Sequence, residues 1–506
     1  MTIYENNSDT KVKLHLRQLL TGLGSLLGAV ASGMSNGYSA ILLPQLKTIS
    51  SNESSYESTD ADHFGELNID QESWIAAAVV LPLTPGCWTG GFMAEKFGRK
   101  MSVMLVCPVY FVGWLIIGLA NGVTSLIIGR LLSGYCMGVL ASIFPIYVSE
   151  TSDPLLRGIL LGAVSLTLAI GTLACHAMGT WLHWRTTAYI CSVLPIICSI
   201  VNIYGKESPL WLLGKGKMEE AKRCWIFLYG IESLEEFSLL ETTRLTEISR
   251  KKTKKRSLLR SLRKAWSSRY FLRPFGIVCL YFFTTQFAGS NVTTFYCVEM
   301  LADVSDPAYA YLITLTIDAI RLIFSVLVCV LLKICRRRTM TFISGFGVAI
   351  TMLSLSVCLT FDIGRPWSPM ILLVIYVALL PLGLIPLPWM LCGELFPRKY
   401  RGLGSGLTSG FGFICFFAVI KTMPPMMEYI KAEGTFAVYG FVALIGTSIL
   451  YFVLPETKNK TLQEIQMFFD KKSHASRAQN VDIPLNEYTS SDKNEELNKK
   501  ISHDNE

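Results

Sequence analysis

The chain has 506 residues, of which 51% are hydrophobic and only 17% charged, and its mean hydropathy is +0.42. Soluble domains carry about a quarter charged residues, so this composition excludes an ordinary soluble protein and indicates a membrane protein in a lipid bilayer. The net charge of +8 points to basic loops near anionic lipid rather than to nucleic-acid binding, because Lys and Arg gather between apolar runs.

The apolar runs predict the transmembrane helices, since about 20 helical residues cross about 30 Å of hydrocarbon. In the first half they are residues 18–46, 73–94, 101–129, 131–149, 158–182 and 186–205. The 101–129 run predicts one span, a turn at Asn121-Gly122 and the start of the next span. In the second half they are residues 274–298, 309–332, 339–361, 366–393, 402–420 and 435–455. We therefore expect an all-α membrane protein with twelve transmembrane helices in two six-helix halves.

A short pattern that occurs twice supports the division into halves. Glu150 is followed seven residues later by Arg157, and Glu394 is followed seven residues later by Arg401. Each copy joins the end of one apolar run to the start of the next, and such internal duplication is typical of secondary transporters. The predicted organisation is listed in chain order: an N-terminus 1–17, a six-helix half 18–205, a linker 206–273 with short helices, a six-helix half 274–455, and a polar tail 456–506, disordered after about 471.

The distribution of Lys and Arg predicts the orientation. The linker 206–273 is strongly basic, whereas the loop 47–72 has one Lys against seven acidic residues. We expect both termini and the linker in the cytoplasm, the acidic loop outside, and the protein in the plasma membrane. Asn52-Glu53-Ser54 lies in the outside loop, so Asn52 is a candidate glycosylation site. The cysteines lie almost wholly in apolar spans, so no structural disulfide is expected.

Charged residues at the cytoplasmic ends of the spans form a candidate gate. Glu95 and Arg99 flank a tight turn at Gly98, where they can pair with charges on neighbouring helix ends. The candidate partners are Glu150, Arg157, Glu394 and Arg401. Ion pairs that form when the cytoplasmic side closes and break when it opens make a two-state gate. The alternative is that these charges only hold the loops in water.

Several motifs resemble those of the sugar porter family of the major facilitator superfamily. They are Gly98-Arg99-Lys100, Gly129-Arg130, the 145–150 segment, Glu207-Ser208-Pro209, Pro386-Leu387-Pro388-Trp389 and Pro455-Glu456-Thr457. Residues 393–397 and 419–422 are also similar to facilitated trehalose transporters of insects. The resemblance implies the major facilitator fold, a small neutral sugar as substrate, and no cofactor or metal. Independently, no span or loop assembles a nucleophile, a base and an orienting group, so we do not expect an enzyme.

The resemblance also implies which residues bind the sugar. A polyol that leaves water needs replacement hydrogen bonds, which amides and hydroxyls supply. Gln286 and Asn291 keep the amides of the sugar porter span-seven motif, whereas Thr285 replaces its first Gln. Ser165 stands where glucose transporters have Gln in span five, and Trp389 is kept in span ten. The lower polar content predicts a wider cavity; the alternative for the two amides is bonding to a neighbouring helix backbone.

Two charged residues lie inside span eight. Asp318 and Arg321 are three residues apart, so they share a helix face and can pair. Charges at membrane depth usually face a cavity or a partner. Arg321 stands where glucose transporters place a substrate-facing Asn, which makes it a candidate binding residue, although a self-satisfied pair is the alternative. His176 in span five is expected to be structural.

The energy source follows from span one. Proton-coupled relatives carry an Asp there, near the span-four Arg; here Ser35 stands at that place and Arg130 remains. A serine hydroxyl does not titrate near neutral pH, so we expect facilitated diffusion of trehalose or a hexose by alternating access. The alternatives are a proton-coupled sugar symporter and a sugar-sensing receptor on a transporter fold.

Overall fold

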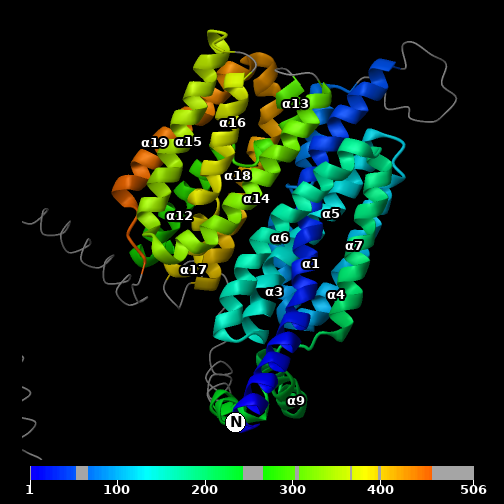
Figure 1. The fold of residues 1–506 in the computed structure, drawn as a ribbon, viewed down its shortest axis with the longest axis vertical. Helices are drawn as coiled ribbons and strands as arrows, with labels where there is room; N and C mark the ends of the chain where they lie inside the picture. The colour runs from blue at the N-terminus through cyan, green and yellow to red at the C-terminus, as the bar shows by residue number, and fades with distance from the viewer. Residues whose placement is uncertain are drawn as a thin grey trace, which may run out of the picture. The chain divides into compact units, whose positions relative to one another are not determined.

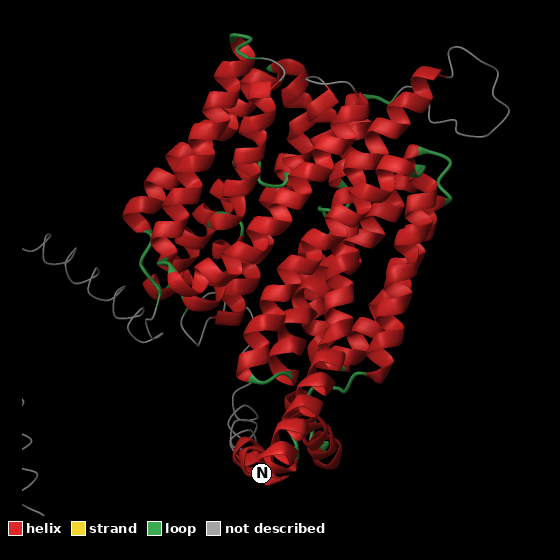
Figure 2. Ribbon diagram, viewed as in Figure 1, coloured by secondary structure: helices red, strands yellow, loops and turns green. Residues whose placement is uncertain are grey.

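A computed structural model describes residues 2–52, 67–242, 266–302, 307–364, 367–396 and 401–458. Every regular element in these residues is a helix, and none is a strand (Figure 2). Most of the acidic loop and the tail predicted to be disordered after about residue 471 lie outside the described residues. Asn52 is the last residue of α1, and the rest of its Asn-Glu-Ser tripeptide also lies outside them.

The first half supplies six membrane crossings (Figure 1). Its helices are α1 (Thr2–Asn52), α2 (Ile69–Ala77), α3 (Leu83–Phe97), α4 (Arg99–Gly118), α5 (Val123–Thr151), α6 (Pro154–Trp181) and α7 (Trp184–Tyr204). The predicted turn at Asn121-Gly122 is confirmed, because it lies between α4 and α5. The second crossing is divided into α2 and α3, and Pro82 and Pro85 stand at this interruption, which the apolar content of the run alone does not reveal.

The linker and the second half follow the same plan. The linker contains α8 (Pro209–Gly214), α9 (Met218–Tyr229) and the 3-10 helix η1 (Ile231–Ser233). The second half contains α12 (Arg269–Phe287), α13 (Val292–Ala302), α14 (Pro307–Ile334), α15 (Arg337–Thr360), α16 (Trp367–Leu379), η2 (Leu380–Leu382), α17 (Pro386–Glu394), α18 (Arg401–Tyr429) and α19 (Lys431–Val453). The seventh crossing is divided into α12 and α13, and the tenth into α16, η2 and α17.

The twelve-span fold class is confirmed. Within the described ranges, 11 segments are long and apolar enough to cross a membrane. The broken pair α2–α3 is the remaining crossing, because each part alone is too short to span 30 Å of hydrocarbon.

The two halves meet along two seams. On one seam α1 packs on α13 and α6 packs on α14; on the other, α2 and α3 pack on α18. Inside the first half, small residues bring backbones together, since a Cβ on Gly33 would lie 2.0 Å from the carbonyl oxygen of Leu168. Close packing of this kind holds helices together where lipid offers no hydrophobic driving force.

The two ends of the bundle are named here by residues. At the Lys47 end, α1 finishes and α2 begins, and the α13 and α18 residues Glu299 and Lys421 contact this region. At the Glu150 end, α3 turns into α4 at Gly98 and α5 finishes.

Candidate functional site

A break in the seventh crossing organises the candidate site. Between α12 and α13, Gly289 has a φ of +80°, and an added Cβ would lie 2.9 Å from the Tyr439 ring, so glycine is required there. The hydroxyl of Tyr376 donates a 2.9 Å hydrogen bond to the carbonyl of Ala288, which lies in the break. The break therefore displays the motif residues on a fixed turn rather than on a continuous helix.

The two amides predicted to bind sugar flank this break and bind each other. Asn291 Nδ2 donates to Gln286 Oε1 at 2.8 Å. Gln286 is 5% exposed and Asn291 is half-buried. An amide has a donor group and an acceptor oxygen, so the pair keeps Gln286 Nε2 as a donor and Asn291 Oδ1 as an acceptor. Neither atom has a hydrogen-bond partner in the described part of the chain, which leaves both for a ligand.

The other predicted sugar contacts differ in their surroundings. The buried Thr285 hydroxyl donates to the carbonyl of Leu384 at 2.9 Å, so it serves the backbone of the tenth crossing. Trp389 is 42% exposed, and its ring centroid lies 4.9 Å from that of Phe282. Ser165 is an exposed residue of α6. Among the described residues, no hydrogen bond or ring contact joins Ser165 or Trp389 to the amide pair.

The predicted pairing of Asp318 with Arg321 is present, with Arg321 Nη1 3.4 Å from Asp318 Oδ1. The guanidinium also donates to the hydroxyls of Thr294, at 2.6 Å, and Thr293, at 3.0 Å. Both threonines belong to the first turn of α13. Arg321 therefore fixes the start of the helix that follows the substrate motif.

Asp318 also makes a contact that sequence reasoning missed. Its Oδ2 contacts Nδ1 of His176 on α6, in the other half of the molecule. Nε2 of His176 lies 3.0 Å from the carbonyl oxygen of Gly37 on α1. The available signal was the isolated His176 in span five, since an ionisable residue at membrane depth usually has a partner; Asp318 already had Arg321 as a partner on its own helix.

Arg130 is completely buried in α5. Its guanidinium donates to the carbonyls of Ile75 at 3.2 Å and Ser35 at 3.3 Å, and to the hydroxyl of Ser39. The Ser35 hydroxyl itself lies 2.6 Å from the hydroxyl of Tyr110. No carboxylate contacts Arg130 in the described ranges, so its described hydrogen bonds go to carbonyl and hydroxyl oxygens.

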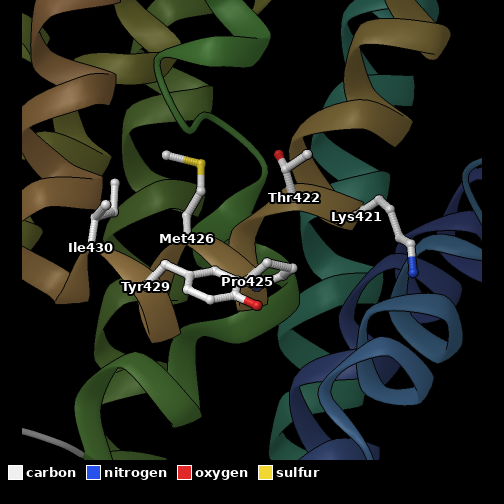
Figure 3. A pocket seen from close by; sticks show the side chains of 6 residues that line it. All are labelled: Lys421, Thr422, Pro425, Met426, Tyr429 and Ile430. Atoms are coloured by element: carbon white, nitrogen blue, oxygen red, sulfur yellow. The ribbon is translucent and has the colours of Figure 1, made fainter.

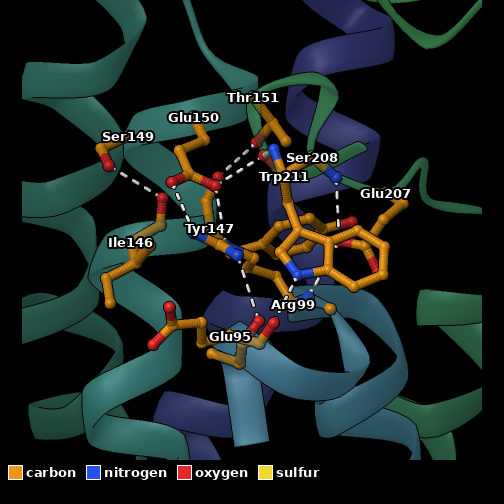
Figure 4. A network of polar contacts seen from close by, with 12 residues as sticks. Glu95, Arg99, Ile146, Tyr147, Ser149, Glu150, Thr151, Glu207, Ser208 and Trp211 are labelled. Atoms are coloured by element: carbon orange, nitrogen blue, oxygen red, sulfur yellow. Dashed lines mark hydrogen bonds and ion pairs between the residues drawn. The ribbon is translucent and has the colours of Figure 1, made fainter. Parts of the chain in front are cut away.

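At the Glu150 end, Glu150 and Arg99 form a two-point ion pair (Figure 4). Arg99 Nε lies 2.8 Å from Oε2 of Glu150, and Nη2 donates to Oε1 at 2.8 Å. Ser208, which caps α8, donates to Glu150 Oε2 at 2.5 Å. Glu207 accepts the backbone N–H of Arg99 at 2.9 Å. The network thus fastens the start of the linker to α4 and α5 of the first half.

Two of the remaining gate candidates, Arg157 and Glu394, also bind within their own halves. Arg157 donates to the carbonyl of Ser152 at 3.2 Å. Glu394 lies 3.6 Å from Arg337 and accepts a 2.7 Å bond from the Thr457 hydroxyl. For the buried Nε and Nη2 of Arg401 and the carboxylate of Glu95, the described residues offer no partner. Among the described residues, no ion pair joins the two halves at this end. The hydrogen bonds between the halves lie further along α3 and α18, from Trp88 Nε1 to the Gly406 carbonyl at 3.1 Å and from the Thr84 hydroxyl to the Gly410 carbonyl at 3.2 Å.

The halves are joined by charges at the Lys47 end instead. Lys47 lies 3.0 Å from both Glu72 of the first half and Glu299 of the second. Lys421 of α18 lies 2.6 Å from Asp70. None of these contacts was predicted, because their partners lie on different helices and, for Lys47–Glu299 and Lys421–Asp70, in different halves. They close the Lys47 end in this structure.

A groove on α18 offers a different surface, of about 370 Å³ (Figure 3). It is lined by Lys421, Thr422, Pro425, Met426, Tyr429 and Ile430. Its lining is almost entirely apolar, and Lys421 is already paired with Asp70. A polar ligand that leaves water needs several hydrogen-bond partners, and this groove offers few of them.

Comparison with known proteins matches this chain to transporters. Residues 23–469 match the family model described as sugar (and other) transporter. The chain is 28% identical to the facilitated trehalose transporter Tret1 of Aedes aegypti, over 89% of this chain and 54% of that protein. It is 28% identical to Tret1 of Polypedilum vanderplanki, over 89% of this chain and 87% of that protein. The chain spans about half the length of several of the curated relatives it matches.

Solved structures share the fold at lower sequence identity. The xylose transporter XylE from E. coli, in a partially occluded inward open conformation, superposes with a TM-score of 0.71 at 19% identity, covering 88% of this chain and 99% of XylE. Its inward open conformation also gives a TM-score of 0.71, covering 88% of this chain and 98% of XylE.

Proposed function

We propose that this chain, which belongs to the sugar (and other) transporter family of the major facilitator superfamily, moves trehalose or a hexose across the plasma membrane by facilitated diffusion. The chain is thereby a multi-pass membrane transporter by family and not an enzyme. Trehalose is preferred because the two relatives named above, from Aedes aegypti and Polypedilum vanderplanki, are facilitated trehalose transporters.

The observation that carries the sugar proposal is the hydrogen-bonded pair of the buried Gln286 and the half-buried Asn291. A sugar hydroxyl both donates and accepts, so it matches the donor of Gln286 and the acceptor of Asn291. The pair presents no net charge, which suits a neutral substrate. Arg321 acts from the next helix by holding Thr293 and Thr294, rather than as an unpaired cation that would favour an anion.

The distribution of contacts between the halves supports alternating access. With the basic linker in the cytoplasm, the Glu150 end is cytoplasmic and the Lys47 end is external. The described charges then bridge the halves externally and separate at the cytoplasmic end. Such a carrier is closed to the outside. In this state Glu95, Glu150 and Arg401 form no described ion pair with the opposite half.

Facilitated diffusion is proposed because the first crossing lacks an acid beside Arg130. In proteoliposomes, labelled trehalose or glucose should equilibrate to an inside-to-outside ratio of one. Imposing a gradient from about pH 5.5 to about pH 7.5, across which an ordinary His titrates, should leave that final ratio unchanged. Competition among unlabelled trehalose, glucose and sucrose identifies the preferred sugar.

Two results contradict this function. Accumulation above a ratio of one that a protonophore abolishes means proton-coupled symport. Saturable sugar binding by the purified protein with no flux above that of protein-free liposomes means a sugar-sensing receptor.

A further inference from the structure

The hydrogen-bond partners of His176 indicate how many protons its contact with Asp318 holds in the seam between the halves. Nε2 faces the carbonyl oxygen of Gly37 at 3.0 Å, and a carbonyl only accepts, so Nε2 carries a hydrogen. Nδ1 faces the carboxylate of Asp318. An ionised carboxylate also only accepts, so a proton must lie on Nδ1 or on Asp318. The contact therefore holds one proton more than a neutral histidine and an ionised aspartate possess.

The pair is isolated from water. His176 is 2% exposed and Asp318 is 4% exposed. Burial makes an unshared charge costly, so the extra proton and the carboxylate stabilise each other. Arg321 Nη1 lies 3.4 Å from the second carboxylate oxygen of Asp318, so its positive charge further stabilises the ionised carboxylate.

The neighbouring groups do not exchange protons near neutral pH. On the packed helices, the charged or titratable groups nearby are Tyr38 (α1), Arg130 (α5), Cys175 (α6), Cys191 (α7), Cys297 (α13), Arg321 (α14) and Tyr376 (α16). Arginine stays protonated, and buried thiols and phenols stay neutral. The contact between His176 and Asp318 is therefore the place among these groups where a proton can be passed to water that enters the seam.

The pair lies on a seam that alternating access must open. His176 belongs to α6 and lies five residues before its last residue, Trp181, at the Lys47 end. Asp318 belongs to α14 of the other half. When the Lys47 end opens, these helices must separate there, and the contact between the two side chains breaks.

We propose that His176 and Asp318 form a proton-binding site that closes the Lys47 end of the transporter. One proton is bound where the side chains meet. When the halves part, the proton of Nδ1 passes to water entering the seam, leaving a neutral imidazole and a carboxylate paired with Arg321. The proton returns when the seam closes.

This site makes the conformational equilibrium depend on pH. The closed state binds one more proton than the open state, so its population rises as pH falls, by up to about tenfold per pH unit. Because Arg321 links Asp318 to Thr293 and Thr294, the change also reaches the helix beside Asn291. The site sets the rate of exchange and does not by itself drive sugar uphill, since the proton can leave on the side from which it came.

The test measures closure of the Lys47 end directly. Spin labels are placed at Trp181→Cys and Trp367→Cys, two exposed positions at this end in opposite halves, in full-length protein whose partly exposed native cysteines are replaced by serine. Pulsed electron-spin distances are recorded at equal pH on both sides, from about pH 5.5 to about pH 7.5, the interval in which histidine changes charge. The short-distance population should grow as pH falls.

Variants assign the effect to the pair. His176→Gln and Asp318→Asn should remove the pH dependence. Lys421→Met is the matched control, because it removes an ion pair at the same end and leaves the His176–Asp318 contact unchanged. It should favour opening at every pH and keep the slope. If the distance distribution of the carrier with native His176 and Asp318 does not change with pH, the proposal is wrong. This measurement does not depend on whether either variant folds. A slope that survives His176→Gln overturns the proposal too.

Failure of this proposal is distinguishable from failure of facilitated diffusion. If a proton gradient drives accumulation that His176→Gln abolishes, the proton site stands and facilitated diffusion fails. If sugar equilibrates at an inside-to-outside ratio of one while the spin-label distances do not change with pH, facilitated diffusion stands and the proton site fails.

Discussion

Replacing Gln286 with Ala weakens sugar binding by about 5- to 150-fold, because a buried hydrogen-bonding group that loses its partner costs about 1–3 kcal/mol. The change removes the donor Nε2 offered to the sugar. It also deprives Asn291 Nδ2 of its present acceptor, 2.8 Å away. The measurement is the dissociation constant of the purified carrier for unlabelled sugar, with surface expression checked in parallel.

Two further variants interpret that loss. Thr285→Ser keeps the hydroxyl that binds the Leu384 carbonyl, so it serves as the matched control in the adjacent position and should leave affinity nearly unchanged. Asn291→Ala should cost a similar amount, and the double variant should cost less than both losses together, because the amides act as a unit. Full affinity in Gln286→Ala would mean that the amide pair only supports the helix break.

The sequence alone was sufficient to predict the positions of the membrane crossings and the pairing of Asp318 with Arg321 within one helix. Apolar runs of helical length predict spans because hydrocarbon thickness imposes a length. Asp318 and Arg321 were paired correctly because residues three apart on a helix are neighbours. The amides of the seventh crossing were identified by a motif, but their mutual bond depends on the backbone turn at Gly289.

Contacts across the seams could not be predicted in the same way. His176 and Asp318 are 142 residues apart, and Lys421 and Asp70 are 351 apart. Residue types and periodicity predict which face of a helix is polar, but not which helix of the other half it meets. An isolated charge in a span predicts that a partner exists; only the packing of the two halves identifies that partner. The breaks in the second and tenth crossings were missed because a count of apolar residues does not weigh Pro82, Pro381 and Gly383, which stand at the breaks.

Replacing Arg401 with Ala shifts the carrier toward the form that is open at the Glu150 end, by about 5- to 150-fold for a lost coupling of about 1–3 kcal/mol. In the present structure the buried Nε and Nη2 of Arg401 have no partner among the described residues, so the substitution breaks no described contact of this state. The guanidinium gains an acid only if the gate closes. Thermal stability of the open form should therefore remain unchanged while its population rises.

Glu150→Ala behaves differently because Glu150 already holds Arg99 and Ser208. Removing it leaves a partly buried guanidinium without its acid, so this variant should lower thermal stability as well as favour opening. Glu150→Gln keeps hydrogen-bonding capacity toward Ser208 and separates loss of charge from loss of contact. The readout is the spin-label distance between Phe97→Cys and Ile334→Cys, exposed positions at the Glu150 end in opposite halves.

A double-mutant cycle then identifies the acid that Arg401 meets when the gate closes. If that acid is Glu150, combining Arg401→Ala with Glu150→Gln should shift the distances less than the two single effects added together. If it is Glu95, whose carboxylate contacts no described residue in this state, the same non-additivity should appear with Glu95→Gln instead. If the shifts in distance are additive with both acids, or if Arg401→Ala leaves the distances unchanged, these charges are not a gate and only hold the loops in water. Non-additivity with either acid makes the Glu150 end a gate whose ion pairs form only as those at the Lys47 end separate.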